Sequence, residues 1–170
     1  MAEQSFELAE QVFRPKVQGS EVLANLLTGR DLDFLLFCSS ISALLPIAGA
    51  SSYAAANMFQ DRYAVWCRQH LGLPTISVNF DAWQEAGMAA EMPAEADFEA
   101  IKEARLRVAM SPEEGIEVVE RALAWGEPQL MVSTVEISSV LRAAMAGIQL
   151  SALPGRRSAN IPASAEASDS

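Results

Sequence analysis

The sequence predicts an α/β fold built on a parallel sheet. Three short apolar segments, 34–38, 74–80 and 129–135, have the composition of strands. Helical segments separate them, and strands that alternate with helices are typical of parallel sheets. Three strands make a small sheet, whereas a doubly wound nucleotide-binding fold normally has two halves. We therefore expect this chain of 170 residues to hold one of the two halves.

The first part of the chain is expected to form a helix, a strand and a second helix. Apolar residues recur at helical spacing over Glu7–Leu27, where Pro15 and Gly19 should kink or divide the helix. The continuous apolar segment Phe34–Cys38 suits a strand that is buried on both faces. A loop of small residues then leads to an alanine-rich helix over Ser52–His70.

The middle of the chain should add a strand and two helices. The second strand, over Pro74–Phe80, is followed by an irregular loop and by a charged helix over Ala94–Ala109. Another helix should begin after Ser111, because serine suits the N-cap, the next residue is proline, and Glu114 occupies the capping-box position. Gly126 should end it.

A third strand over Gln129–Val135 and a short helix over Ile137–Ala146 complete the predicted domain, which spans residues 1–146. Residues 147–170 are rich in serine, alanine and proline, which predicts a linker or a disordered tail.

Composition excludes several classes of function. The chain is 51% hydrophobic, with a net charge of −10 and a pI of about 4.5. Nucleic-acid binding needs a basic stripe, and anionic membranes also attract basic surfaces, so we expect neither partner. The sequence has no secretory signal and no apolar segment of transmembrane length, which predicts a cytoplasmic protein.

We expect the cysteines and tryptophans of the predicted helices and strands to have structural roles. Cys38 and Cys67 are too few for a disulfide framework, and both lie in apolar segments that predict buried, reduced thiols. With a single histidine, they offer no metal-ligand cluster, and no metal site is expected. Trp66 and Trp125 fit apolar helix faces and are expected in the core.

Four residues together suggest carbonyl reduction, which needs a hydride at carbon and a proton at oxygen. Tyr53 and Asn57 lie at positions i and i+4 of one helix, and Ser40 lies at the end of the first strand. A phenol titrates near pH ~10, so it donates a proton at neutral pH only if a cation such as Lys16 stabilises the phenolate. Ser40 could hydrogen-bond the substrate oxygen. Each residue alone has an ordinary structural explanation, and the joint spacing favours the site.

Several segments resemble the ketoreductase domains of modular polyketide synthases, which belong to the short-chain dehydrogenase/reductase superfamily. The first strand with its serines, Phe37–Ser40, and the sequence Tyr53-Ala54-Ala55-Ala56-Asn57 carry the resemblance. Arg14–Gly19 is similar to the family segment that holds the active-site lysine. The resemblance covers roughly Phe6–Leu141 and continues through Asn79–Trp83, Ala86–Ala89, Ser111–Trp125 and Met131–Thr134.

The resemblance implies roles for the four residues. Ordinary short-chain dehydrogenases place the lysine four residues after the tyrosine, whereas polyketide ketoreductases have asparagine there and lysine on the earlier helix, as in Asn57 and Lys16. Tyr53 would be the proton donor, and Ser40 would orient the carbonyl. The hydride would come from NADPH. The substrate would be a β-ketoacyl chain on the phosphopantetheine arm of an acyl carrier protein, within a polyketide synthase.

The resemblance also implies cofactor and substrate contacts. The cofactor side would include Tyr53, Lys16 and the residues after the second strand, Asp81, Ala82 and Trp83. The substrate pocket would include Leu45, Trp83 and Met88. Leu45 stands where the family has a tryptophan that marks one product configuration, and the family's Leu-Asp-Asp marker of the other configuration would lie upstream of these residues.

The sequence departs from the family in one respect. The nine glycines are scattered and form no G-x-G-x-x-G loop, which a dinucleotide fold uses to hold the pyrophosphate. We therefore expect the C-terminal half of a Rossmann-like sheet without the N-terminal nucleotide-binding half, so that the outer edge of the first strand is unpaired. A truncated piece of a synthase is expected, with a split enzyme as the alternative. Two other functions stay open: an inactive fragment or interaction module, and a stand-alone reductase of small ketones.

Overall fold

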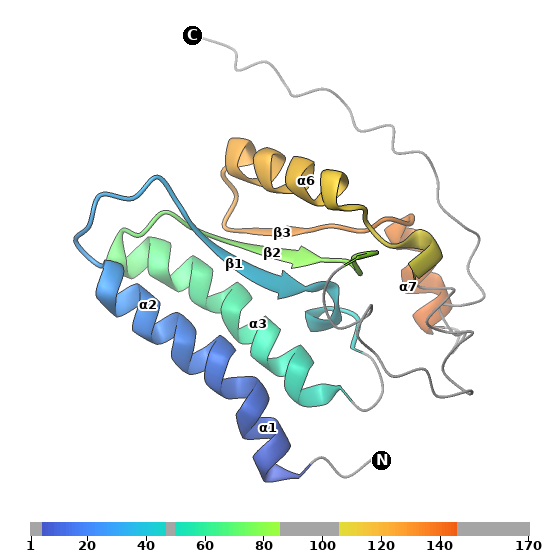
Figure 1. Ribbon diagram of the computed structural model, residues 1–170, viewed down its shortest axis with the longest axis horizontal. Helices are drawn as coiled ribbons and strands as arrows, with labels where there is room; N and C mark the ends of the chain where they lie inside the picture. Colours follow the sequence, from blue (N-terminus) through green and yellow to red (C-terminus); the bar gives the residue numbers. More distant parts are fainter. Residues whose placement is uncertain (1–4, 47–49, 86–105, 146–170) are drawn as a thin grey trace, which may run out of the picture.

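The computed structural model describes residues 5–46, 50–85 and 106–145, which Figure 1 shows as coloured ribbons. The helices and strands are α1 (Phe6–Phe13), α2 (Gly19–Leu27), β1 (Leu35–Ser40), α3 (Ser51–Trp66), β2 (Thr75–Phe80), α6 (Pro112–Trp125), β3 (Gln129–Met131) and α7 (Ile137–Met145). Most of the helix expected over 94–109, and the tail expected over 147–170, lie outside the described residues.

The three strands form one parallel sheet in the order β1-β2-β3. β1 pairs with β2 along its whole length, from Leu35 opposite Thr75 to Ser40 opposite Phe80. β1 is therefore an edge strand, and no other described strand pairs with its outer side. The predicted α/β fold with a small parallel sheet is confirmed.

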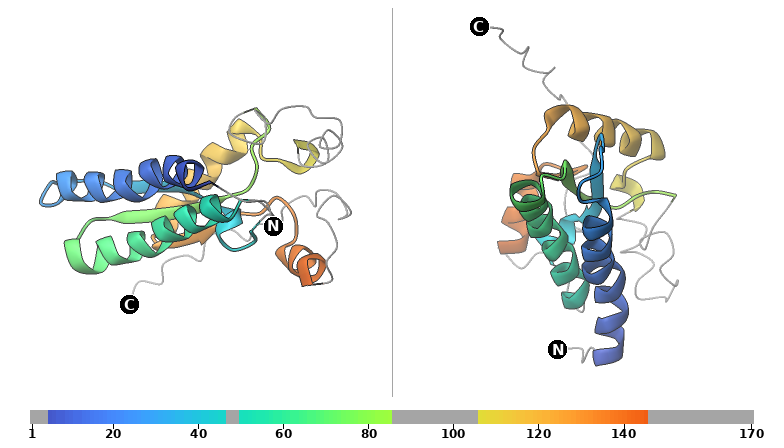
Figure 2. Two further views of the ribbon diagram at one scale, coloured as in Figure 1. Left: turned by 90° about the horizontal axis from the view of Figure 1, so that it is seen from below. Right: turned by 90° about the vertical axis from the view of Figure 1, so that its left-hand side faces the viewer.

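Helices cover both faces of the sheet. Figures 1 and 2 show α1, α2 and α3 along one face and α6 along the other. The central strand β2 is buried at all six positions, because it contacts helices on both faces and strands on both edges.

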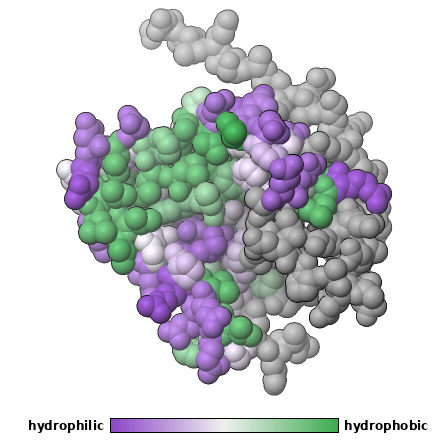
Figure 3. Space-filling model, in the orientation of Figure 1, coloured by the Kyte–Doolittle hydropathy of each residue, from purple (hydrophilic) through white to green (hydrophobic). Residues whose placement is uncertain are grey.

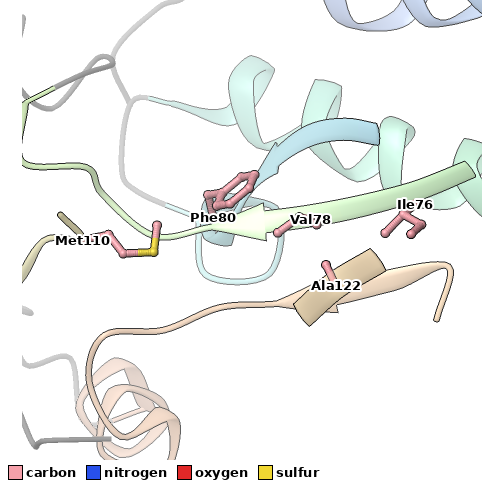
Figure 4. Close-up of a cluster of buried hydrophobic side chains, with 5 residues drawn as sticks. All are labelled: Ile76, Val78, Phe80, Met110 and Ala122. Carbon is pink, nitrogen blue, oxygen red and sulfur yellow. The ribbon is translucent and has the colours of Figure 1, made fainter. Parts of the chain in front are cut away.

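The face of β2 toward α6 is apolar. Ile76, Val78 and Phe80 form a buried cluster with Ala122 of α6 and with Met110, as Figure 4 shows. Val118, Val119 and Leu123 of α6 pack against this cluster.

The opposite face of β2 is polar although it is equally buried. Thr75, Ser77 and Asn79 have no exposed surface, and Ser77 and Asn79 donate hydrogen bonds to the Asp61 carboxylate of α3. Alternate residues of one strand thus serve two different layers, as the pleat of a strand requires.

The predicted division of the first helix takes the form of a single π-helical turn, Arg14–Gln18, between α1 and α2. Pro15 has no N–H, so the regular α-helical ladder cannot continue through it. The turn widens, and the N–H of Gly19 bonds to the carbonyl of Arg14, five residues back. Lys16 lies inside this turn.

The third strand is shorter than predicted, ending at Met131 rather than at Val135. The N–H of Val132 still bonds to the Asn79 carbonyl at 3.0 Å. The backbone N–H of Thr134, by contrast, bonds to the Asp81 carboxylate at 3.2 Å, so a side chain takes the place of the neighbouring strand.

Three burial predictions were wrong. Trp66 is 41% exposed and stacks on Tyr63 along the outer side of α3. Trp125 is 73% exposed because it is the last residue of α6, past Ala122 and the helix's final contacts with the core. Cys38 is exposed, since it alternates with the buried Phe37 and Ser39 on the edge strand, whereas Cys67 is buried as predicted.

Among the described residues, no helix combines the length and apolar character needed to cross a membrane.

Candidate active site

The candidate site forms where β1 ends and α3 begins. Ser40 is the last residue of β1, and Tyr53 lies in the first turn of α3, with Asn57 one turn later. Lys16 reaches the same region from the π-helical turn. Ligands of open α/β sheets bind outside the carboxyl ends of the strands, which is the end that Ser40 occupies.

Lys16 is held by two neutral acceptors beside the tyrosine. Its ammonium donates to the Cys38 carbonyl at 2.8 Å and to Gln60 Oε1 at 3.0 Å. The nitrogen lies 5.8 Å from the centre of the Tyr53 ring, within the range of a cation–π contact. An ammonium has three N–H donors, so one remains for a further partner.

Burial lowers the pKa of Lys16 below its usual value of 10.5, because the half-buried ammonium has lost part of its hydration. Electrostatic interactions with Cys38 and with Asp61 act in the opposite direction and raise the pKa.

Asn57 is completely buried, and one of its polar atoms has no partner. Its amide nitrogen donates to the Tyr53 carbonyl at 2.7 Å, which ties together the two turns of α3 that carry the site. Its amide oxygen, Oδ1, makes no hydrogen bond to any described residue. A buried acceptor without a hydrogen bond costs free energy, so Oδ1 is a position at which a ligand could donate one. The Lys16 ammonium is contacted by Gln60, one helical turn after Asn57, at 3.0 Å.

Ser40 has its hydroxyl prepared to donate. Its oxygen accepts from the backbone N–H of Ser42 at 3.2 Å and from the Ser42 hydroxyl at 2.9 Å. A hydroxyl has two acceptor positions and one donor. With both acceptor positions used, the Ser40 proton is available for an acceptor above the strand end.

A buried polar network supports the site from below. Asn79 donates to Asp61 at 2.7 Å, and its amide nitrogen also lies 3.0 Å from the Ser39 hydroxyl and 3.2 Å from the Ser40 carbonyl. Ser39 in turn donates to the Asn57 carbonyl at 3.3 Å. The network therefore fixes the end of β1 relative to α3.

Sequence reasoning missed Gln60 and Asp61. Both are polar residues at buried positions of α3, 7% and 1% exposed. They follow Asn57 by three and four residues, the spacing that places side chains on one helix face. That spacing was the available signal.

The family resemblance assigns Asp81, Ala82 and Trp83 to the cofactor side of the site. These three residues directly follow β2. Asp81 accepts from the Ala82 N–H at 2.8 Å with one oxygen and from the Thr134 N–H and hydroxyl at 3.2 Å with the other. It thus joins the loops that follow β2 and β3. Leu45 is partly buried just after β1, and Met88 lies outside the described residues.

Trp83 packs against the sheet and α6. Its ring lies 5.5 Å from that of Phe80, and its backbone forms a bridge with Met110. A Cβ atom added to Gly115 of α6 would lie 2.1 Å from the indole, so the ring occupies the space above this glycine.

A broad apolar surface adjoins the site. Figure 3 shows a hydrophobic patch on the face turned to the viewer, where α2 and β1 lie in Figure 1. A groove of about 610 Å³ opens here, and its lining includes Val22, Leu23, Leu36, Cys38 and Lys16.

The parallel sheet, with serine, tyrosine, lysine and asparagine grouped at the carboxyl end of its edge strand, defines the chain as a short-chain dehydrogenase/reductase-type α/β protein. The model of the KR (ketoreductase) domain family matches residues 1–85. The chain therefore belongs to this family.

Relatives and solved structures agree with this assignment. The chain is 36% identical over 124 residues to the highly reducing polyketide synthase GPY1 of Gibberella fujikuroi, and this match covers 73% of the chain and 5% of the relative. It is 35% identical over 137 residues to polyketide synthase GfsB of Streptomyces halstedii, a match that covers 80% of the chain and 2% of the relative. The first ketoreductase of the tylosin polyketide synthase superposes with a TM-score of 0.67 and 30% identity, over 90% of this chain and 32% of the ketoreductase.

The chain therefore spans about a third of the solved ketoreductase and a few per cent of the synthases that it matches.

Proposed function

We propose that this chain carries the catalytic residues of a β-ketoacyl reductase that acts on polyketide intermediates bound to an acyl carrier protein. The observation that supports this most is the half-buried Lys16 ammonium beside the Tyr53 ring, at the strand end that carries Ser40.

Each residue has a distinct role in the proposed reaction. The Tyr53 hydroxyl gives its proton to the ketone oxygen as that oxygen gains negative charge. Ser40 donates a hydrogen bond to the same oxygen, because both acceptor positions of its hydroxyl are occupied by Ser42. The Lys16 ammonium favours the phenolate left behind on Tyr53 by electrostatic attraction.

The residues present fit the nicotinamide end of NADPH, which supplies the hydride when bound. Lys16 retains one N–H that suits a ribose hydroxyl, and Asn57 Oδ1 is a buried acceptor without a partner among the described residues. Tyr53 contacts both of these residues, through its ring and its backbone carbonyl, and Asp81, Ala82 and Trp83 follow the end of β2. The choice of NADPH rather than NADH rests on the family resemblance.

The open edge of β1 suits the rest of such a domain. The outer side of β1 pairs with no described strand, and the adjoining groove is lined by apolar side chains such as Val22 and Leu36. We infer that residues 1–146 form one part of a ketoreductase domain and that a nucleotide-binding half from outside these residues pairs with the open edge of β1. Residues 147–170 would link this domain to the next part of a cytoplasmic synthase.

A second candidate function is an interaction module that keeps the catalytic residues without turning over substrate. It is favoured by the lack of a glycine-rich phosphate loop in the sequence.

The two candidates are separated by placing this segment in a complete ketoreductase domain and offering it NADPH and a β-ketoacyl thioester. We expect NADPH consumption and formation of the β-hydroxyacyl product. A folded domain that binds NADPH, seen by nicotinamide fluorescence, but never reduces the thioester would contradict the proposed reaction and support the second candidate.

A further inference from the structure

Gln60 is a buried residue of α3 that sequence reasoning did not connect with the site. Its side-chain oxygen accepts from the Lys16 ammonium at 3.0 Å. Its side-chain nitrogen donates to the Ser20 hydroxyl at 3.1 Å, and Ser20 donates to the Lys16 carbonyl at 2.5 Å. These contacts form a closed ring of hydrogen bonds from the lysine side chain back to its own backbone.

The ring determines the orientation of the Gln60 amide. Because its nitrogen is committed to Ser20, its oxygen faces the ammonium. Ser20 and Gln60 are 2% and 7% exposed, so water does not compete freely for these groups. In such surroundings a correctly oriented amide dipole stabilises a charge more strongly than it would in water.

A lysine side chain is a flexible four-carbon stem, and holding it in one orientation requires more than one contact. The Cys38 carbonyl fixes the ammonium relative to the edge strand, and Gln60 fixes it relative to the helix that carries Tyr53. Gln60 lies seven residues after Tyr53, two turns along the same helix, so any movement of α3 would carry Tyr53 and the lysine's partner together.

We propose that Gln60, held by Ser20, is the positioning residue that orients the Lys16 ammonium toward Tyr53 and keeps it charged. The significance of this arrangement for catalysis rests on the proposed ketoreduction, whereas the arrangement itself can be tested without it.

The charged state of Lys16 depends on all the groups around it. Burial lowers the pKa of this lysine, and electrostatic interactions with Cys38 of β1 and with Asp61 of α3 oppose the effect of burial. Tyr53 also faces the ammonium. Gln60 adds a neutral acceptor, so its removal should lower the pKa further, and a carboxylate in its place should raise it.

The test is an NMR titration of the full chain with isotope-labelled lysine. The sequence has two lysines, Lys16 and Lys102, so the spectrum is simple and Lys102 serves as an internal reference. Three variants are compared with the wild type: Gln60→Leu, Gln60→Glu and Ser20→Ala. The control is Gln69→Leu, which makes the same chemical change at an exposed position in the helical turn that follows α3.

We expect Gln60→Leu to lower the midpoint of the Lys16 titration by roughly half a pH unit to one pH unit. Ser20→Ala should lower it less, because the amide becomes free to rotate. Gln60→Glu should raise it, and Gln69→Leu should leave it unchanged. Shifts of opposite sign at one position distinguish electrostatic contact from general loosening of the fold. Unchanged Lys16 midpoints in both Gln60 variants, or shifts of the same sign, would overturn the proposal.

If Gln60→Leu does not fold, Gln60→Glu and Ser20→Ala decide the outcome, and a Gln60→Glu variant that fails to raise the midpoint contradicts the proposal. In a complete ketoreductase domain, Gln60→Leu should lower kcat and move the basic limb of its pH profile to lower pH, with little change in KM for the thioester. If the wild-type domain is inactive while the titration behaves as expected, the proposed function fails and the role of Gln60 in holding Lys16 stands.

Discussion

The two faces of β2 are equally buried and differ in what they contribute. Toward α6, Ile76, Val78 and Phe80 exclude water with apolar side chains. Toward α3, Ser77 and Asn79 bond to Asp61, and Asn79 continues to the end of β1. Apolar contacts are tolerant of direction, whereas hydrogen bonds fix it. We infer that the first face mainly stabilises the sheet and that the second mainly orients the catalytic residues.

The apolar face should show the larger loss of stability. Ile76→Ala removes a side chain that is 3% exposed and leaves a cavity between β2 and α6, so we expect the free energy of unfolding to fall by about 2–4 kcal/mol. Ile116→Ala on α6, where the side chain is 61% exposed, is the matched control and should cost less than about 0.5 kcal/mol. Urea unfolding measures both. Equal losses would mean that this face is not the main core.

On the polar face, Asp61→Leu should cost about 2–3 kcal/mol, because the donors of Ser77 and Asn79 lose their acceptor and remain buried. Ser77→Ala removes only one of these donors and should cost about 1 kcal/mol. A double-mutant cycle by urea unfolding should show coupling between the two sites, since they share a hydrogen bond. Strictly additive losses would show that the network does not act as a unit.

Close packing of Trp83 against α6 can be tested with two glycines. Gly115→Ala places a Cβ atom 2.1 Å from the indole of Trp83 and should destabilise the chain by about 1–3 kcal/mol. Gly19→Ala in α2 meets only the Arg14 carbonyl, at 3.8 Å, and should stabilise it by up to about 1 kcal/mol through helix propensity. Thermal unfolding compares the two. A neutral Gly115→Ala with unchanged Trp83 fluorescence would contradict the described packing.

The smallest expected effect is a pH dependence that arises from Lys16. Its pKa is lower in the folded chain than in the unfolded chain, so between the folded value and 10.5 the unfolded state binds more protons. The free energy of unfolding should therefore receive a contribution from Lys16 that rises with pH across this window. Lys16→Met should remove that contribution, and Lys102→Met, the other lysine in the sequence, should not. Identical pH profiles of the wild type and Lys16→Met in urea unfolding would contradict the burial of this charge.

Patterns along the chain predicted most of the fold. The capping box at Ser111 and Glu114 and the end of α6 at Gly126 occur where the sequence places them, because caps depend on neighbouring residues alone. Burial was harder to predict: a helical pattern shows that Trp66 or Trp125 lies on an apolar stripe, but not how far the sheet extends beneath it.

The candidate site likewise has a part that the sequence predicted and a part that it did not. Spacing and resemblance led to Lys16, Ser40, Tyr53 and Asn57, whose roles remain proposals. The partners that hold them, Gln60, Asp61 and Asn79, form contacts between residues 16 and more positions apart in the sequence, which local patterns do not reveal.

The most direct test of the proposed site compares the two tyrosines of the chain, Tyr53 and Tyr63, in a complete ketoreductase domain that carries this segment. Both lie on α3, and Tyr63 stacks with Phe59 and Trp66 away from the strand end that carries Ser40. NADPH-dependent reduction of a β-ketoacyl thioester is measured for Tyr53→Phe and Tyr63→Phe, with folding checked by circular dichroism. We predict that Tyr53→Phe lowers kcat by about 10²-fold or more and that Tyr63→Phe retains most of it. Undiminished reduction by a folded Tyr53→Phe domain would contradict the assignment of Tyr53 as the proton donor.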